Sequence, residues 1–322
     1  MDAVVIRNSR SSSATVSADL YVGGILPGNN LTYLMMKIAP YCQPKCEEWD
    51  DKHLSKRKLY LFKKLLDKLL LDKDLMLKGF DSVIHTAGKV GGLGGNMYHK
   101  GEFFYDNIMI NTNVIESARI SGVKNLVAFL STCVFPNDIE YPLTEKKIHL
   151  GPPHFSNDAY AYSKRMVDVQ IRAYKEQYGL NYKSVIPTNI YGPNDNYDIK
   201  NGHVLPSLIH KCFLARENKT PLTIWGSGNP LREFIFSRDV ANLTEWVLHN
   251  YNESEPIILS TSEEISIKDI VSMIVEIMNF KGDVVFDTSK PDGQHRKPSD
   301  NSKIKSELGI EFNGVLDVAD PR

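Results

Sequence analysis

NLVAFLS, residues 125–131, is an apolar run that has the length of a buried strand and ends on a hydroxyl side chain. A similar run, Ser82 to His85, precedes it, and a third, Tyr182 to Ile186, follows it. Helical patterns at Phe103–Ser121 and Asp158–Tyr178 separate the three runs. Strands that alternate with helices form βαβ units. We therefore predict an α/β fold with a doubly wound, Rossmann-like parallel sheet covered by helices on both faces.

The pattern changes after residue 192, where Pro and Gly recur and the spacing becomes irregular. Helical patterns return near His203–Arg216, Val240–Tyr251 and Ile267–Met278. We predict a dinucleotide-binding domain over residues 1–192 and a smaller, substrate-binding lobe over residues 193–322.

Ligands of open α/β sheets bind beyond the carboxyl ends of the strands. In this chain Thr86, Ser131 and Pro187 fall at those ends. We therefore expect the functional site to lie near these three residues.

Composition excludes several classes of partner. The 322 residues carry a formal net charge of -1, so no overall field favours nucleic acid or an anionic membrane. The start has no signal-peptide pattern and no window has the length of a membrane span, so we expect a cytosolic protein. Four scattered cysteines do not form a disulfide framework. Cys42 and Cys46 lack further ligands at metal spacing, so we expect no metal.

The first 75 residues differ from the rest. Residues from Leu54 to Leu77 form a leucine- and lysine-rich pattern with helical spacing. It predicts an amphipathic helix packed on the sheet, with a membrane-surface or partner helix as the alternative. Nothing before it gives a clear strand–turn–helix unit.

The strongest local chemical signal is YAYSK, residues 160–164. Tyr160 and Lys164 are four residues apart, so on a helix they project from one face. There the ammonium group would lower the pKa of the phenol. Ser131 lies about thirty residues earlier, at the end of a strand, where its hydroxyl can hydrogen-bond a substrate carbonyl. Tyr162 lacks a partnering Lys and is not expected to react.

Several longer motifs show a closer relationship. They are KVGGL at 89–93, STCVFP at 131–136, PTNIYGP at 187–193, GHVLP at 202–206 and WGSGNP at 225–230. This pattern resembles the GDP-L-fucose synthases, which belong to the extended short-chain dehydrogenase/reductase family. The resemblance runs from about Asp81 to Asn313, roughly seven tenths of the chain.

The resemblance implies a reaction in two parts. The family inverts C3 and C5 of GDP-4-keto-6-deoxy-D-mannose, then reduces C4 with NADPH to give GDP-L-fucose. Ser131, Tyr160 and Lys164 would serve the reduction. Cys133 is implied as the base of the epimerisation and His203 as its acid. Their ordinary pKa values, about 8.5 and 6.5, suit these roles, although a lone Cys or His is more often structural.

Two related reactions are disfavoured by visible residues. A sugar-nucleotide 4,6-dehydratase would carry an acidic pair after Ser131, but TCVF at 132–135 offers no carboxylate. A simple 4-epimerase needs no Cys/His pair.

Further roles follow from the resemblance alone. For the cofactor, NADPH, it implies Lys164, Pro187, Thr188, Asn189, Ile190 and His203. For the GDP-sugar substrate it implies Lys211, Trp225, Arg232 and Asp292. The chemistry agrees, because Lys and Arg pair with a diphosphate, Trp stacks on rings and Asp accepts hydrogen bonds from hydroxyls.

The resemblance also implies a homodimer. It would be built from the helices at 103–121 and 158–178 of each subunit, packed as a four-helix bundle. We expect apolar positions there to be partly free for the partner; these are Ile108, Val114, Ile115, Val167 and Ile171.

One feature departs from the family, whose members open with a strand and a G-x-x-G-x-x-G turn that holds the cofactor pyrophosphate. Before Gly79 this chain has only Gly23, Gly24 and Gly28, which do not form that pattern. The glycine cluster at 88–95 also follows a strand and is a candidate replacement for that turn, but we interpret it as a loop that the family has in addition to the turn. An alternative is therefore a non-catalytic relative that binds the sugar nucleotide but has lost tight NADPH binding.

Overall fold

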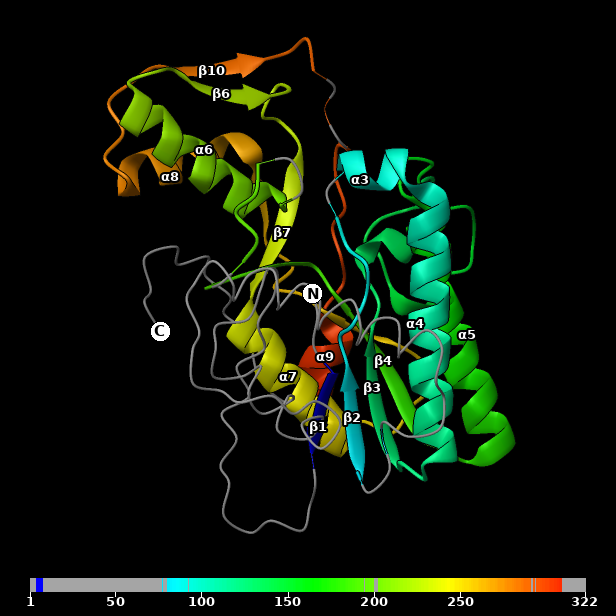
Figure 1. Cartoon of the computed structure of the whole chain (residues 1–322). Helices are drawn as coiled ribbons and strands as arrows, with labels where there is room; N and C mark the ends of the chain where they lie inside the picture. The colour runs from blue at the N-terminus through cyan, green and yellow to red at the C-terminus, as the bar shows by residue number, and fades with distance from the viewer. Residues whose placement is uncertain are drawn as a thin grey trace, which may run out of the picture.

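A computed structural model describes residues 4–7, 77, 80–91, 93–193, 195–199, 202–290, 292 and 294–308. Its larger sheet has five strands in the order β1-β2-β3-β4-β8 (Figure 1). Their bounds are β1 Val4–Arg7, β2 Ser82–His85, β3 Asn125–Phe129, β4 Asn181–Pro187 and β8 Ile257–Leu259. Strands β2, β3, β4 and β8 are mutually parallel, and β1 pairs antiparallel with β2 at one edge. The predicted α/β fold with a parallel sheet is confirmed.

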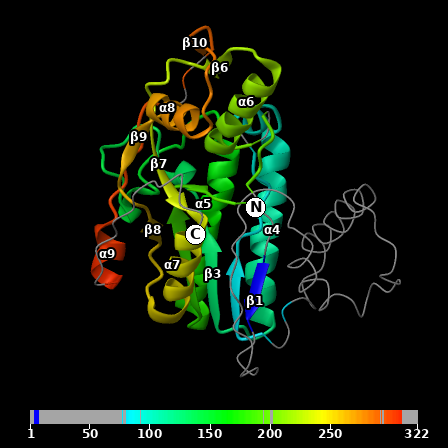
Figure 2. The ribbon, with the colours of Figure 1, turned by 90° about the vertical axis from the view of Figure 1, so that its left-hand side faces the viewer.

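Helices cover both faces of this sheet (Figure 2). Helices α4 (Lys100–Ile120) and α5 (Asp158–Tyr178) lie on one face, and α7 (Ser237–Asn250) lies on the other. The side chains of β3 explain why its sequence is apolar throughout. Leu126 and Ala128 enter the core under α4 and α5, while Val127 and Phe129 enter the core under α7. A strand buried on both faces has no polar side to show.

A smaller layer stands above the carboxyl ends of the strands (Figure 1). In it β6 (Leu222–Trp225) pairs in parallel with β10 (Val284–Asp287). Helices α6 (Val204–Asn218) and α8 (Ile267–Ile277) share a third hydrophobic core with this pair. The smaller layer and the larger sheet thus have separate cores.

A three-stranded sheet links the two parts. It consists of β5 (Asn189–Tyr191), β7 (Leu231–Phe236) and β9 (Glu264–Ser266). Strand β5 follows β4 after one residue, so the chain passes directly from the larger sheet into this connection. The remaining elements are α3 (Leu93–Tyr98), α9 (Ser302–Leu308) and two short turns, η2 (Thr132–Val134) and η3 (Glu145–Lys147).

The predicted helices are found where the pattern placed them, with small shifts at their ends. Helix α5 has the predicted bounds, and α4 starts three residues before the predicted start. Residues after 193 contribute to both parts, because β8 is a strand of the larger sheet and α7 packs against that sheet. The division into domains at residues 1–192 and 193–322 stays a prediction.

The predicted helix over 54–77 lies outside the described residues, apart from Leu77, which is buried in the core under α4 and α5. No helix among the residues that the structure describes is long and apolar enough to cross a membrane.

The expectation about free apolar positions on α4 and α5 was wrong for four of the five residues named; the fifth, Ile108, is partly exposed. Val114, Ile115, Val167 and Ile171 are at most 2% exposed and lie in the core against the sheet. The helices use these positions entirely for their own subunit, so a dimer surface must be sought among other side chains.

Candidate functional site

The short turn after β3 carries two of the predicted site residues. Ser131 precedes η2 in an extended conformation, and its Oγ accepts a hydrogen bond from the backbone N–H of Cys133 at 3.3 Å. The Cys133 thiol is free and half-buried. Its Sγ accepts a hydrogen bond from Nδ2 of Asn157 at 2.9 Å. The sequence analysis did not single out Asn157, since Asn at a helix start is ordinary.

Tyr160 and Lys164 lie one turn apart on α5 and are 7% and 3% exposed. The Lys164 Nζ lies 6.0 Å from the centroid of the Tyr160 ring and donates a hydrogen bond to the Phe129 carbonyl at 2.9 Å. Helix α5 thus presents both groups to the carboxyl end of β3, as the spacing predicted.

Burial sets the protonation of this pair. Loss of hydration lowers the pKa of Lys164 to about 8. Burial, with the nearby Cys133, raises the pKa of Tyr160 above its ordinary value. The expectation that Lys164 lowers the phenol pKa was wrong, because desolvation dominates. The phenol is thereby kept protonated, which is the form that can donate a proton.

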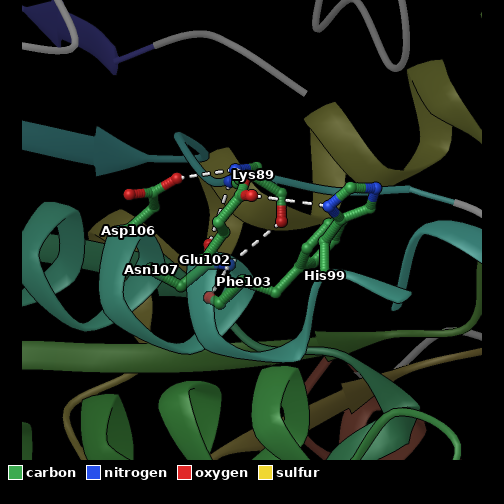
Figure 3. Close-up of polar contacts among 6 residues, drawn as sticks. All are labelled: Lys89, His99, Glu102, Phe103, Asp106 and Asn107. Carbon is green, nitrogen blue, oxygen red and sulfur yellow. Dashed lines mark hydrogen bonds and ion pairs between the residues drawn. The ribbon is translucent and has the colours of Figure 1, made fainter. Parts of the chain in front are cut away.

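Asn107 of α4 holds the loop after β2 in place (Figure 3). The Asn107 side chain accepts from the Lys89 backbone N–H at 2.9 Å and donates to the Lys89 carbonyl at 3.0 Å. A Cβ on Gly88 would lie 3.1 Å from Asn107 Oδ1 and 3.4 Å from Lys164 Nζ. Glycine at 88 therefore lets the loop approach the buried ammonium closely.

Two carboxylates of α4 also hold the loop after β2. The Lys89 ammonium forms ion pairs with Glu102 at 2.7 Å and Asp106 at 2.8 Å (Figure 3). Burial opposes the charge on Lys89, but the hydrogen bonds to Asp106 and Glu102 outweigh it and raise the pKa of Lys89. The KVGG motif is thus held to α4 through its first residue.

The run at 187–190 joins the end of β4 to the start of β5. Pro187, Thr188 and Ile190 are buried, whereas Asn189 is exposed and donates to the Glu233 carbonyl at 2.7 Å. The Thr188 hydroxyl is buried and has no hydrogen-bond partner among the described residues. A buried hydroxyl without a partner suits a polar ligand, since such a group otherwise costs free energy.

Trp225 marks the site on the smaller layer. Its side chain is 65% exposed at the end of β6, unusual for so large an apolar ring. The ammonium groups of Lys211 and Lys290 lie 5.0 Å and 5.8 Å from its ring centroid. Asp292 is held nearby by Ser227, whose N–H and hydroxyl donate to its two oxygens at 2.8 Å and 2.7 Å. The sequence analysis missed Lys290.

Arg232 of β7 and Lys297 bring positive charge toward Cys133. Burial lowers the pKa of both basic groups, and each interacts electrostatically with Cys133; Lys297 also interacts with Arg232, and Arg232 with Asp292. Among the residues that the structure describes, neither forms an ion pair. Lys297 lies between β10 and α9 and belongs to none of the motifs, so it could not be predicted from the sequence.

His203 stands at the start of α6, on the side of the smaller layer. Burial lowers the pKa of His203 below its ordinary value. Within the described part of the chain no hydrogen bond joins His203 to Ser131, Cys133 or Tyr160. The structure therefore brings Ser131, Cys133, Tyr160 and Lys164 together and places His203 at the start of α6, in the smaller layer.

No group of three or more metal-ligating side chains occurs in the described part of the chain. Cys42 and Cys46 lie outside that part.

Comparison with known proteins gives a consistent result. Residues 44–260 match the model of the NAD dependent epimerase/dehydratase family. The chain is 55% identical over 226 residues to a GDP-L-fucose synthase of Dictyostelium discoideum, which covers 70% of this chain and 71% of that protein. It is 46% identical over 235 residues to a probable GDP-L-fucose synthase of Drosophila melanogaster, covering 70% and 73%.

Solved structures agree. A GDP-L-fucose synthetase from Naegleria fowleri bound to NADP superposes with a TM-score of 0.69 at 45% identity, covering 73% of each chain.

Proposed function

The chain belongs to the NAD dependent epimerase/dehydratase family and, within it, to the GDP-L-fucose synthases, and we propose that it makes GDP-L-fucose from GDP-4-keto-6-deoxy-D-mannose with NADPH as the reductant. One observation carries this proposal. A buried Tyr160–Lys164 pair and a half-buried cysteine, Cys133, share the carboxyl end of β3. An enzyme that only reduced a ketone would need the Tyr160–Lys164 pair but not Cys133. An enzyme that also inverts the carbon next to the ketone needs a base, and the Cys133 thiolate can be that base.

In the reduction, the cofactor when bound supplies the hydride for C4 of the sugar. Tyr160 gives its phenolic proton to the C4 oxygen, and the Ser131 hydroxyl donates a hydrogen bond to the same oxygen. The Lys164 ammonium lies close enough to stabilise the phenolate that remains. Burial keeps Tyr160 protonated before the step, so the proton is present when the hydride arrives.

In the epimerisation, the Cys133 thiolate removes a proton from the carbon beside the ketone. The negative charge moves onto the C4 oxygen, where Ser131 and Tyr160 can stabilise it as hydrogen-bond donors. His203 would return a proton to the other face of that carbon. Inversion requires an acid and a base on opposite sides of the carbon; Cys133 lies in the turn after β3 and His203 at the start of α6 in the smaller layer.

The smaller layer would bind the GDP part of the substrate. The exposed Trp225 ring offers a stacking surface, and Asp292, oriented by Ser227, can accept hydrogen bonds from hydroxyls. Lys211 and Arg232 can neutralise the diphosphate. Lys297 lies near Arg232 and adds a second positive group on the path toward Cys133.

The cofactor would lie across the ends of β2 and β4. We expect Lys164, His203 and the run Pro187, Thr188, Asn189 and Ile190 to contact it. The Thr188 hydroxyl, which has no hydrogen-bond partner among the described residues, fits a polar ligand there.

We also propose a homodimer through α4 and α5. Their outer faces expose large apolar side chains, among them Phe104 at 44%, Tyr162 at 40%, Met166 at 41% and Val169 at 38%. Two such faces would bury each other as a four-helix bundle. Light scattering at micromolar concentration should give twice the chain mass of 36.4 kDa, and the monomer mass alone would contradict the dimer.

We place the activity in the cytosol. The chain has four scattered cysteines, and those described, Cys133 and Cys212, are free thiols. Free thiols suit a reducing compartment. Cell fractionation that recovered the chain only with secreted protein would contradict this.

The test of the function is a reaction with purified chain, NADPH and GDP-4-keto-6-deoxy-D-mannose, followed by the loss of NADPH absorbance and by identification of the sugar product. We expect GDP-L-fucose. If NADPH is oxidised but the product is reduced at C4 without inversion at C3 and C5, the chain is a reductase and not an epimerase. Binding of the GDP-sugar with no consumption of NADPH would favour a non-catalytic relative.

A further inference from the structure

Asn157 stands at the N-terminal cap of α5, but its side chain does not cap the helix. An Asn at this position usually accepts a hydrogen bond from a backbone N–H of the first turn. Here the side chain makes no such bond, and Nδ2 donates to Cys133 Sγ at 2.9 Å. The Asn157 side chain therefore hydrogen-bonds the Cys133 thiol and not the backbone at the helix end.

The backbone around Cys133 is already fixed without Asn157. The Ser131 Oγ accepts from the Cys133 N–H at 3.3 Å, and the buried Arg165 donates from Nε to the Val134 carbonyl at 2.7 Å. These contacts hold the turn but leave the thiol free to rotate among its staggered positions. The contact from Asn157 is the one hydrogen bond among the described residues that reaches Sγ itself.

The charged and titratable groups around the thiol come from three elements. Tyr160 approaches from α5, Arg232 from β7 and Lys297 from the segment before α9. The two cations attract a thiolate but do not fix the direction of its lone pairs. An amide N–H donates a hydrogen bond and cannot give up its proton at neutral pH, so it favours a thiolate without neutralising it.

We propose that Asn157 is a positioning residue, which holds the Cys133 thiolate toward the sugar ring by donating an amide N–H to Sγ. The proposal rests on the proposed function for the role of Cys133 as the base. It adds a residue that acts on the epimerisation and not on the reduction, because Asn157 touches Cys133 while Lys164 is fastened separately, to the Phe129 carbonyl.

The test compares the whole chain with Asn157→Asp and Asn157→Leu. Aspartate keeps the size and a favourable cap residue but replaces the donor with a carboxylate that repels a thiolate. Leucine removes the donor without adding charge. Asn250→Leu, at the exposed far end of α7, is the matched control.

The first measurement is the rate at which iodoacetamide alkylates Cys133 over pH 6 to 10, read from its peptide by mass spectrometry. Only the thiolate reacts. We expect the rate at pH 7 to fall about tenfold in Asn157→Leu and further in Asn157→Asp, with the midpoint of the profile displaced to higher pH. Asn250→Leu should match the parent chain.

The second measurement is uptake of solvent deuterium at C3 and C5 of the 4-keto sugar. We expect it to fall in both Asn157 variants in parallel with the alkylation rate. Alkylation profiles equal to that of the parent chain in both variants would overturn the proposal, whatever happens to the deuterium uptake. If the parent chain itself takes up no deuterium, the proposed function fails, and the alkylation profile still decides whether Asn157 holds the thiolate.

Discussion

The two walls of the site differ in how their polar groups are satisfied. At the end of β3, the reacting groups are bound to other parts of the protein: Cys133 to Asn157 and Lys164 to the Phe129 carbonyl. On the smaller layer and beside it, Arg232 and Lys297 form no ion pair among the described residues, and Trp225 is largely exposed. The reacting groups of the first wall are thus held by hydrogen bonds before a ligand binds. The second wall has positive charges that a ligand can pair with and an exposed ring that a ligand can cover.

This difference indicates a division of work. Groups that move protons must hold their geometry throughout the reaction. Groups that bind a diphosphate gain most when their charge is not already neutralised by the protein. Substitutions on the first wall should therefore change rates, and substitutions on the second wall should change affinity.

The largest effect is expected for Tyr160→Phe. General acid catalysis contributes roughly 10² to 10⁴-fold, so the rate of NADPH oxidation should fall by about that factor. Deuterium uptake into the sugar should remain measurable, because it depends on Cys133. Tyr162→Phe, which alters the neighbouring exposed ring, is the control and should keep the parent rate. Full reductase activity in Tyr160→Phe would remove this residue from its role.

Cys133→Ser should lower deuterium uptake by about 10²-fold, since a hydroxyl is a far weaker base than a thiol near neutral pH. Uptake would be measured by mass spectrometry of the recovered sugar. Cys212→Ser, which alters the other described free thiol in the core of the smaller layer, should leave uptake intact. Unchanged uptake in Cys133→Ser would mean that this thiol only packs.

Arg232→Ala tests the second wall. A charge-assisted hydrogen bond contributes about 1.5–3 kcal/mol, so the KM for the GDP-sugar should rise roughly 10- to 100-fold with a much smaller change in kcat. The exposed Arg238→Ala on α7 is the matched control. A fall in kcat at unchanged KM would contradict the division between the walls.

The smallest effect concerns pH. The pKa of Lys164 is lowered to about 8, so its ammonium is present below that pH and is lost above it. The reduction rate at pH 9 should therefore be about tenfold below that at pH 7. Single-turnover measurements across this range would show the fall. A rate that stays flat to pH 10 would mean that the charge of Lys164 does not assist the step.

Much of this arrangement could be predicted from the sequence. The apolar run at 125–130 gave the buried strand, and the four-residue spacing placed Tyr160 and Lys164 on one face of a helix. Local spacing carries such information because both groups lie on the same element. It carried none about Lys297, whose approach to Cys133 depends on how a distant segment returns to the site.

Two expectations from the sequence were wrong: the direction of the pKa shift of Tyr160 and the exposure of apolar side chains on α5. The sequence assigned Lys164 the dominant effect on the phenol of Tyr160, but burial of the ring outweighs a neighbouring charge. It left Val167 and Ile171 free for a partner, although the sheet uses them fully. Burial depends on all surrounding elements, so a single periodic pattern cannot supply it.

The central claim is that one site both inverts and reduces the sugar. The most direct test is a reaction of the purified chain with GDP-4-keto-6-deoxy-D-mannose and NADPH in deuterium oxide, with the product examined by NMR. The account predicts GDP-L-fucose that carries solvent deuterium at C3 and C5 and a hydrogen from NADPH at C4. A product with deuterium at neither C3 nor C5 would contradict it, as would the absence of any reduced sugar.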